Sequence, residues 1–353
     1  MLEDRTGDMK QRYTIVIGLG IGLLMLALVL AGVDLNRVRE AFAGADYRFV
    51  LPAFALLVVG HFTRAIRWRV LLGGKLPLRH AFSILNISYL FNGALPFRLG
   101  EVARIFLAAR VDNPIPAFTT LSTILVERLL DLLTVLAMLG MVLVVLPVPD
   151  YITATGITLG GGSLVSIAAL TVFAARRAWA FGLLAWGQRV LPFLGRWPME
   201  EALGRFLDGL QPLASWRGGL SVVFWSAVSW GFSLLAGYIL LYAFFPQSDW
   251  TAVLLFIVMA SFAVAVPYVP GAVGPYEAGV VVALHLTGFD RPEGAALAFA
   301  VILHVTNLGV YTLLGLLGLV QEGVTMGQVA RGARELQAAS PPGVEQVGTE
   351  PLG

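Results

Sequence analysis

The segments Pro96-Phe-Arg-Leu-Gly100-Glu101 and Pro270-Gly271-Ala-Val-Gly274-Pro-Tyr-Glu277 decide the fold of this chain. Each places a proline, a glycine four residues later and then a carboxylate inside sequence that is otherwise apolar enough for a membrane. Helix breakers and ionisable groups are tolerated at membrane depth only where protein or a water-filled cavity covers them. A matched pair of such segments, one in each half of a chain, is typical of transporters that bind their substrate near the membrane midplane. The predicted helix breaks are Pro96, Gly100, Pro270, Gly271 and Gly274.

The composition is that of a membrane protein. Hydrophobic residues make up 58% of the chain and charged residues only 13%, with a mean hydropathy of +0.80, whereas soluble domains are about one quarter charged. The formal net charge is only +2, which argues against nucleic-acid binding. The chain has no cysteine and four scattered histidines, so the sequence offers no disulfide, thiolate or metal-ligand pattern. We therefore predict no metal site and no cofactor.

Six apolar runs are long enough to form membrane-crossing helices. These runs are 13–33, 49–72, 118–146, 151–175, 218–245 and 294–320. Between them, the broken regions 80–110 and 250–288 predict re-entrant helical hairpins, although each pair of arms can also be two full crossings. The predicted fold is an all-α polytopic membrane protein with about six crossings and two hairpins, giving eight or more membrane segments.

The loop charges predict an orientation, because lysine and arginine accumulate on the cytoplasmic side. Basic residues precede the first run, which lacks a cleavage pattern and is therefore predicted to be a retained helix. Arginines also gather after the second run, after the fourth run and near the C-terminus, so both termini are predicted to be cytoplasmic. In this orientation each half of the chain has the order helix, helix, hairpin, helix, and the second half is inverted relative to the first. This order predicts inverted repeats at about 13–146 and 151–320. Both repeats are predicted to belong to a single transmembrane domain, 1–337.

Two further segments stand apart from the crossings. Segment 178–216 mixes tryptophan and other apolar side chains with arginine and glutamate. This mixture is typical of an amphipathic helix lying on the cytoplasmic leaflet, and a plain linker is the alternative. The tail 338–353 has little to pack and is predicted to be disordered.

The first hairpin carries candidate headgroup ligands. Arg98, Glu101 and Arg104 are spaced three apart, so all three can share one face of a helix that follows the proline. Arginine suits phosphate because its planar donors bind two oxygens at once, and the amides of a helix N-terminus add an anion site. Asn92 can supply a further amide. The alternative is a kinked helix with an ion cluster that satisfies itself.

A second charged cluster lies in and beside the third crossing. Glu127, Arg128 and Asp131 lie about 13 Å along this helix, on spacings that let Arg128 reach Asp131. They form either a structural ion-pair lock or ligands for a substrate or coupling ion. Arg64 and Arg67, near the end of the second crossing, are either anchors on the cytoplasmic side or further phosphate ligands.

Glu277 has no lysine or arginine within a dozen positions. It therefore either meets an arginine of the opposite hairpin or changes protonation during transport, because burial disfavours an unpaired carboxylate. His304 and Asn307, three apart in the last crossing, are predicted to make interhelical hydrogen bonds.

Three motifs in this order resemble the transmembrane region of the lysylphosphatidylglycerol synthase family. They are Asn92 with Pro-Phe-Arg-Leu-Gly-Glu-Val-Ala-Arg at 96–104, Val-Glu-Arg-Leu-Leu-Asp at 126–131, and Pro-Gly-Ala-Val-Gly-Pro-Tyr-Glu at 270–277. The resemblance covers about 13–320. In bifunctional members this region moves aminoacylated phosphatidylglycerol between leaflets, and a soluble C-terminal domain synthesises that lipid. The resemblance implies the flippase-like part without the synthase domain, and it does not carry over the aminoacylated substrate.

Together these features predict a lipid translocase of the cytoplasmic membrane rather than an enzyme. The expected partner is a membrane lipid: an anionic or aminoacylated phospholipid, or a polyprenyl-linked lipid. A homo-oligomer is compatible with the sequence. The chain has no Gly-rich nucleotide-binding loop, so the energy is expected from an ion gradient or from downhill movement. The alternatives are an ion-coupled transporter of a small anionic solute, an intramembrane enzyme, for which no nucleophile and base fall together, and a membrane scaffold of envelope biogenesis.

Overall fold

The computed structural model shows a chain that is helical wherever its regular structure is described. It describes residues 34–95, 98–146, 150–191, 198–265, 269–289 and 291–338, together with residues 20, 24 and 27. The first predicted crossing, 13–33, lies outside these residues apart from three positions, as do Pro96 and, apart from Ala338, the predicted disordered tail. Within the described ranges there is no β-strand. The all-helical prediction is therefore confirmed for these residues.

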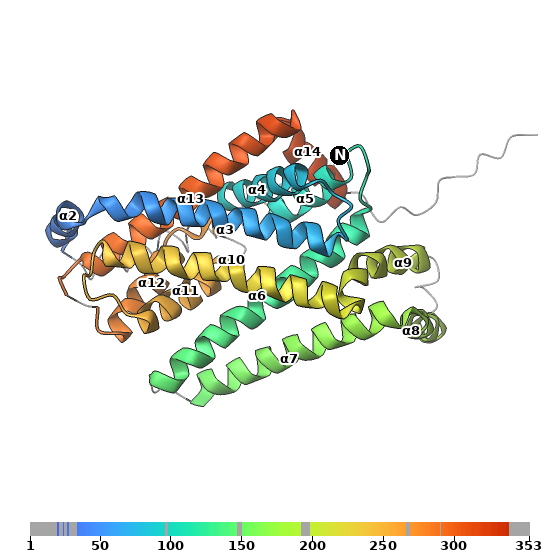
Figure 1. Ribbon diagram of the computed structural model, residues 1–353, viewed down its shortest axis with the longest axis horizontal. Coiled ribbons are helices and arrows are strands. Elements are labelled where there is room, and N and C mark those ends of the chain that lie inside the picture. Colours follow the sequence, from blue (N-terminus) through green and yellow to red (C-terminus); the bar gives the residue numbers. More distant parts are fainter. Residues whose placement is uncertain are drawn as a thin grey trace, which may run out of the picture.

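The helices follow one another with short connections (Figure 1). In chain order they are α2 (Leu35–Gly44), η1 (Tyr47–Phe49), α3 (Val50–Leu71), α4 (Leu78–Ala94), α5 (Leu99–Ala108), α6 (Ala117–Val145), α7 (Asp150–Ala175), α8 (Arg177–Val190), α9 (Met199–Leu210), η3 (Gln211–Ala214), α10 (Trp216–Tyr242), α11 (Trp250–Ala265), η4 (Pro270–Ala272), α12 (Pro275–Leu286), α13 (Ala295–Glu322) and α14 (Met326–Ala338).

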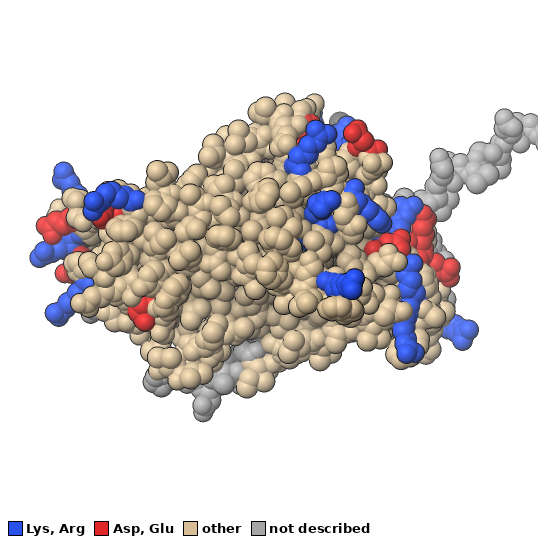
Figure 2. All heavy atoms as spheres, viewed as in Figure 1, with Lys and Arg blue, Asp and Glu red and all other residues tan. Residues whose placement is uncertain are grey.

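Four helical stretches are long and apolar enough to cross a membrane. They are Tyr47–Leu71, Ala117–Val145, Trp216–Tyr242 and Ala295–Glu322, and the bent pair formed by α7 and α8 makes a fifth candidate. Charged side chains gather towards the two ends of the long axis and leave a broad uncharged surface between them (Figure 2). This distribution matches a belt that faces hydrocarbon. The chain is therefore a multi-pass membrane protein.

The centre of the bundle is built from close helix pairs. α3 and α10 run side by side along the long axis (Figure 1) and share a buried hydrogen bond of 2.9 Å between the Thr63 and Ser229 hydroxyls. α13 packs against α4 through glycines, because a Cβ at Gly318 would lie 2.7 Å from the Ser83 carbonyl oxygen. Small residues allow such close backbone approach in membranes, where packing and hydrogen bonds drive helix association.

The first broken region forms a helical hairpin of α4 and α5. Arg98, just before α5, has a left-handed backbone with φ of 51°. The amide of Gly100 donates to the Asn92 side-chain oxygen at 2.9 Å, which satisfies one of the free amides at the start of α5. A Cβ at Gly100 would overlap the Ser88 carbonyl oxygen, so this glycine is required for α5 to fold back onto α4.

The second broken region forms the hairpin of α11 and α12. Gly271 and Gly274 have positive φ angles of 61° and 94°, a conformation that favours glycine. The Glu277 side chain accepts from the Gly274 amide at 2.7 Å and caps α12. With 10 residues in α5 and 12 in α12, these arms are roughly 15 and 18 Å long. Both are much shorter than a hydrocarbon core of about 30 Å.

The two hairpin tips touch in the middle of the molecule. α4 and α5 occupy one half of the long axis, and α11 and α12 occupy the other (Figure 1). Arg98 of the first hairpin donates to the Val264 carbonyl oxygen of the second at 3.3 Å. A Cβ at Gly271 would lie 3.1 Å from the Gly93 carbonyl oxygen. The breaks that we predicted in separate halves of the sequence therefore meet in space.

The segment 178–216 differs from the single amphipathic helix that we predicted. It contains two helices, α8 and α9, and the sequence between them includes Pro192 and Pro198, which cannot donate to a helical hydrogen-bond ladder. α8 turns 104° from the end of α7. α9 packs against α6 and buries Leu207 and Leu210.

The α4–α13 contact generates a test of the packing. We expect Gly315→Ala to lower the free energy of unfolding by about 1–3 kcal/mol, because the added Cβ would meet Leu90 and lie 3.0 Å from the Asn86 carbonyl oxygen. Gly140→Ala is the matched control, since a Cβ at that position would meet no neighbouring group within 4 Å. Thermal unfolding in detergent measures both variants. Equal stability of the two would contradict this account of the interface.

Candidate functional site

An ionic network lies where the first hairpin meets three spans. Its side chains come from α3, α5 and α6, with hydroxyl and indole groups from α10. The charged members are Arg64, Arg67, Glu101, Arg104, Glu127, Arg128 and Asp131. The structure thus brings together residues that we predicted from three separate motifs.

Glu127 is the centre of this network. Its side chain is only 1% exposed and lies between two arginines. Its Oε2 accepts from Arg104 Nη1 at 2.5 Å, and its Oε1 lies 3.6 Å from Arg67 Nε. The Arg104 guanidinium also covers the Trp68 ring, with Cζ 3.8 Å from the ring centroid. Ion pairing and cation–π contact together offset the loss of water around these buried charges.

Asp131 extends the network to α10. It accepts from Arg67 Nη1 at 2.8 Å and from the Trp230 indole at 3.2 Å. Arg67 also donates to the Ser226 hydroxyl at 3.2 Å. One arginine of α3 therefore joins both carboxylates of α6 to a neighbouring span.

The half-exposed edge of the network is formed by Glu101 and Arg128. Their side chains are 26% and 37% exposed and approach to 3.5 Å. Arg128 also lies 4.0 Å from Asp131, the contact that the i,i+3 spacing predicts. At 3.5 Å this contact is too long for a hydrogen bond of ordinary strength, and its two atoms, Glu101 Oε1 and Arg128 Nε, are buried without a hydrogen-bond partner among the described residues.

Arg64 and Arg98 have no carboxylate within 4 Å among the described residues. Arg64 donates to the Tyr89 hydroxyl at 3.4 Å and to the Ser233 hydroxyl at 3.2 Å. Within the described ranges, Arg98 donates to the Val264 carbonyl oxygen, and it lies close enough to Glu101 to be influenced by its charge. With Arg98 included, five arginines and three carboxylates share this region, an excess of two positive charges. Such an excess of positive charge favours the binding of an anionic group.

The row of Arg98, Glu101 and Arg104 that we predicted on one helix face is not formed. Arg98 precedes the first turn of α5, and its left-handed backbone takes it off the helix. Glu101 and Arg104 instead turn to different partners on α6. Asn92, which we predicted as a ligand amide, uses its carbonyl oxygen to cap α5.

Glu277 lies in the second hairpin and has partners other than an arginine among the described residues. Its Oε1 lies 2.6 Å from His304 Nδ1 of α13, and its Oε2 accepts from the Gly274 amide. Tyr276 stacks on the His304 ring at 4.1 Å. The predicted interhelical hydrogen bond of His304 is therefore present. Of the two alternatives that we left open for Glu277, the contact with an arginine of the other hairpin is not formed among the described residues. Asn307 reaches the Tyr276 hydroxyl at 3.5 Å.

Sequence reasoning missed the neutral members of the site. Ser226, Ser229, Trp230 and Ser233 of α10 provide its hydroxyl and indole groups. A signal for them exists, because serines at spacings of three and four follow one face of a membrane helix. Tyr89 of α4, stacked on Tyr311 of α13 with ring centroids 5.5 Å apart, carries no such signal.

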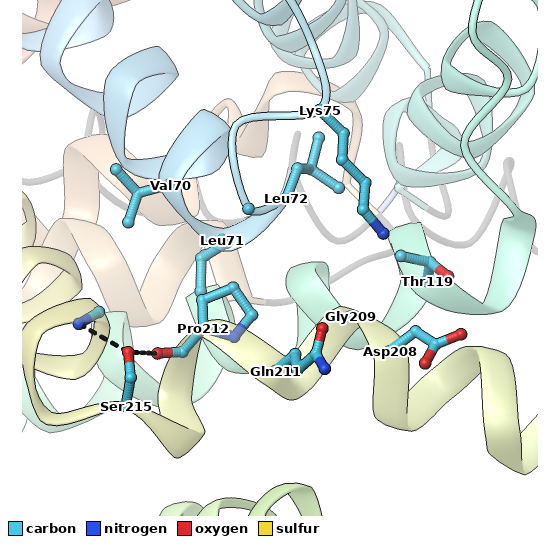
Figure 3. Close-up of a pocket in the computed structure, with 12 residues that line it drawn as sticks. Val70, Leu71, Leu72, Lys75, Thr119, Asp208, Gly209, Gln211, Pro212 and Ser215 are labelled. Atoms are coloured by element: carbon cyan, nitrogen blue, oxygen red, sulfur yellow. Dashed lines mark hydrogen bonds between the residues drawn. The ribbon is translucent and has the colours of Figure 1, made fainter.

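A separate surface pocket of about 430 Å³ lies at the end of α3, beside α6, α9 and η3 (Figure 3). Lys75 extends across it towards Thr119, and Asp208 lies on the α9 side (Figure 3). Thr119 is eight residues before Glu127 on α6, a distance of roughly 12 Å along the helix. The pocket is therefore not the ionic network.

In the described part of the chain, no group of three or more His, Cys, Asp or Glu side chains could hold a metal ion.

The burial of Glu127 generates a stability prediction. We expect Glu127→Gln to lower the free energy of unfolding by about 3–5 kcal/mol, because Arg67 and Arg104 would lose their buried counter-charge. Glu101→Gln, at the exposed edge, should change it by about 1 kcal/mol or less. Denaturant or thermal unfolding in detergent compares the two. A Glu127→Gln protein as stable as Glu101→Gln would show that the centre of the network is not a buried ion pair.

Comparison with known proteins identifies the family to which this chain is similar. The family model described as the lysylphosphatidylglycerol synthase TM region matches residues 15–315. Glycosyltransferase AglD of Haloferax volcanii is 30% identical over 346 residues, which cover 87% of this chain and 54% of AglD. The chain thus spans about half the length of that relative.

Two proteins named as UPF0104 membrane proteins are similar over most of their lengths. UPF0104 membrane protein PH1989 of Pyrococcus horikoshii is 23% identical, over 86% of this chain and 95% of that protein. A UPF0104 membrane protein of Methanothermobacter thermautotrophicus is 25% identical, over 80% of this chain and 86% of that protein. No solved structure matches. Because the family model covers most of the chain and includes all three motifs, the chain belongs to the lysylphosphatidylglycerol synthase TM region family.

Proposed function

We propose that this protein moves a lipid with an anionic headgroup between the leaflets of the cytoplasmic membrane. The observation that carries the proposal is the arginine-rich network at the meeting point of two broken hairpins. An excess of positive charge at membrane depth is costly unless it serves a ligand or pathway. Phosphate is the anionic group common to membrane lipids, and guanidinium binds it through two parallel hydrogen bonds.

Arg64 and Arg98 are the side chains proposed to bind the phosphate. Arg67 and Arg104 already share Glu127, so removing them from it would leave a buried carboxylate without its partners. Arg64 and Arg98 instead donate to neutral oxygens, which a phosphate can replace at a lower cost. This refines the sequence-based hypothesis, in which Arg98 and Arg104 were the phosphate ligands and Arg64 or Arg67 a further candidate.

The half-exposed pair of Glu101 and Arg128 is proposed to open for headgroups that also carry a positive charge. Its 3.5 Å contact leaves Glu101 Oε1 and Arg128 Nε buried without a hydrogen bond, so replacing Arg128 by an ammonium group that donates to Glu101 costs little. Glu127 and Asp131 then act mainly as fixed counter-charges that hold the arginines in place.

We further propose that the chain is an inverted repeat with eight membrane segments, both termini being cytoplasmic. The packing supports this: α4 packs on α13 as α11 packs on α6, and α3 pairs with α10. A two-fold axis that relates α3 to α10, the first hairpin to the second, and α6 to α13 would carry the α4–α13 contact onto the α11–α6 contact. The same axis would carry the α3–α10 pair onto itself. The short arms support re-entrant hairpins, which would enter from opposite leaflets and meet near the midplane.

A second candidate substrate comes from AglD, whose name describes a glycosyltransferase. It favours a sugar-bearing lipid, including a polyprenyl-linked one, as the molecule that is moved. Such a lipid is also held by phosphate, so the same arginines serve. The protein is proposed to move this lipid and not to catalyse the sugar transfer.

Transbilayer movement of fluorescent phosphatidylglycerol in proteoliposomes tests the proposal. We expect Arg64→Gln and Arg98→Gln each to slow movement at least about tenfold, which corresponds to about 1.4 kcal/mol, because each removes one phosphate donor. Arg217→Gln, at an exposed position beside Trp216, is the control and should move lipid like the wild type.

Parallel arms separate the rival functions. Uptake of radiolabelled inorganic phosphate would identify a transporter of a soluble anion. If the wild type moves no anionic, aminoacylated or polyprenyl-linked lipid, even under a proton gradient, the translocase proposal fails. Folded arginine variants that move lipid at the wild-type rate would remove the assignment of the phosphate site.

A further inference from the structure

A buried carboxylate of the second hairpin, Glu277, meets a buried imidazole of α13, His304, and the phosphate site uses neither. Glu277 and His304 are each 5% exposed, and their side chains meet at 2.6 Å across α12 and α13. Both oxygens of Glu277 are engaged, one by His304 and the other by the Gly274 amide. Nδ1 is the ring nitrogen of His304 that faces Glu277, which leaves Nε2 as the nitrogen where a further proton can be added.

The surroundings isolate this pair from strong charges. α11 presents no ionisable side chain from Trp250 to Ala265. α2 contacts α13 at its first turn, beside Gly294, ten residues before His304. The other titratable groups on the packed helices are Tyr276 and His285 of α12, Tyr311 and Glu322 of α13, Arg79, His80 and Tyr89 of α4, His61, Arg64, Arg67 and Arg69 of α3, Arg217, Tyr238 and Tyr242 of α10, and Arg37, Arg39 and Glu40 of α2.

The charge of the pair changes with a single proton. With a neutral imidazole and an ionised carboxylate, the pair carries a charge of −1 in a low-dielectric site. Addition of one proton at His304 Nε2 gives an imidazolium beside a carboxylate, a neutral ion pair. An uncompensated charge is costly in such a site, whereas a hydrogen-bonded neutral pair is not.

We propose that Glu277 and His304 form a proton-binding site that couples lipid movement to a proton gradient. The inference rests on the proposed translocase function and adds the coupling ion. Glu277 caps α12 at the same glycine-containing break that meets the first hairpin. The tip of that first hairpin, through Arg98, donates to Val264 at the end of α11. A change in the hydrogen bonds of Glu277 therefore acts on the tip of the second hairpin. That tip contacts the first hairpin and, through Val264, helps to position Arg98, a proposed phosphate ligand.

A measurement that needs no lipid substrate tests the proton site. The chain has four histidines, so side-chain NMR of the full chain in detergent gives few signals, and His304→Gln identifies one of them. We expect the His304 signal to change when a proton is added at the ring, because the added charge alters the imidazole. In Glu277→Gln its midpoint should move by at least about one pH unit, a tenfold change in proton affinity. A signal that ignores pH, or an unchanged midpoint, would overturn the site.

Transport then tests the coupling. In vesicles of phosphatidylcholine and phosphatidylglycerol, an imposed proton gradient should change the wild-type rate of fluorescent phosphatidylglycerol movement at least about tenfold. Glu277→Gln and His304→Gln should lose this response. His80→Gln is the matched control, because His80 pairs with Glu322 at 2.9 Å outside the hairpin tips, and it should keep the response.

The outcomes separate the two proposals. Lipid movement by the wild type that ignores the gradient overturns the coupling and leaves the translocase intact. A wild type that moves no lipid contradicts the translocase and therefore also the coupling, while the NMR titration still decides whether the proton site exists. Loss of the response in His80→Gln as well would show a general effect of histidine loss and would remove the assignment to the second hairpin.

Discussion

The architecture depends on one carboxylate, Glu127, held between Arg67 and Arg104. Each of these charges alone would oppose burial, because the interior cannot replace the water that it loses. Together they remain buried only if α3, α5 and α6 keep their relative depth and rotation. The ionic contacts therefore position the short arm α5 against two long helices, which hydrophobic contact alone would not do in lipid.

The broken helices impose a second constraint, since each break frees backbone groups that lipid cannot satisfy. Asn92 satisfies the Gly100 amide, Glu277 satisfies the Gly274 amide, and Arg98 satisfies the Val264 carbonyl oxygen. Polar side chains at the tips thus form hydrogen bonds with backbone groups that the helix breaks leave free, and this role does not depend on a ligand. This explains why polar groups concentrate at the breaks and why the two tips lie in contact.

The sequence predicted the breaks and the charged residues, because proline, glycine and ionisable groups stand out in an apolar chain. It could not predict which charges pair. Spacing constrains partners on one helix, as for Arg128 and Asp131, whereas the pairing of Glu277 with His304 depends on how two helices are rotated. The position of Arg98 was also hidden, because a left-handed backbone at a non-glycine residue has no sequence signature. Within 178–216, Pro192 and Pro198 were visible but their effect on the length of the helix was underestimated.

The two hairpins have complementary electrostatics, and this complementarity bears on how an anion could cross. The first hairpin shares its region with an excess of positive charge, and the second holds a carboxylate whose described partners are an imidazole and a backbone amide. An anionic headgroup near the midplane brings a negative charge towards the hairpin tips, and Glu277 caps the helix that follows the second tip. A proton taken up by the pair of Glu277 and His304 removes one negative charge from the same region. Binding of the anion and of the proton would then favour each other, because each reduces the electrostatic cost of the other.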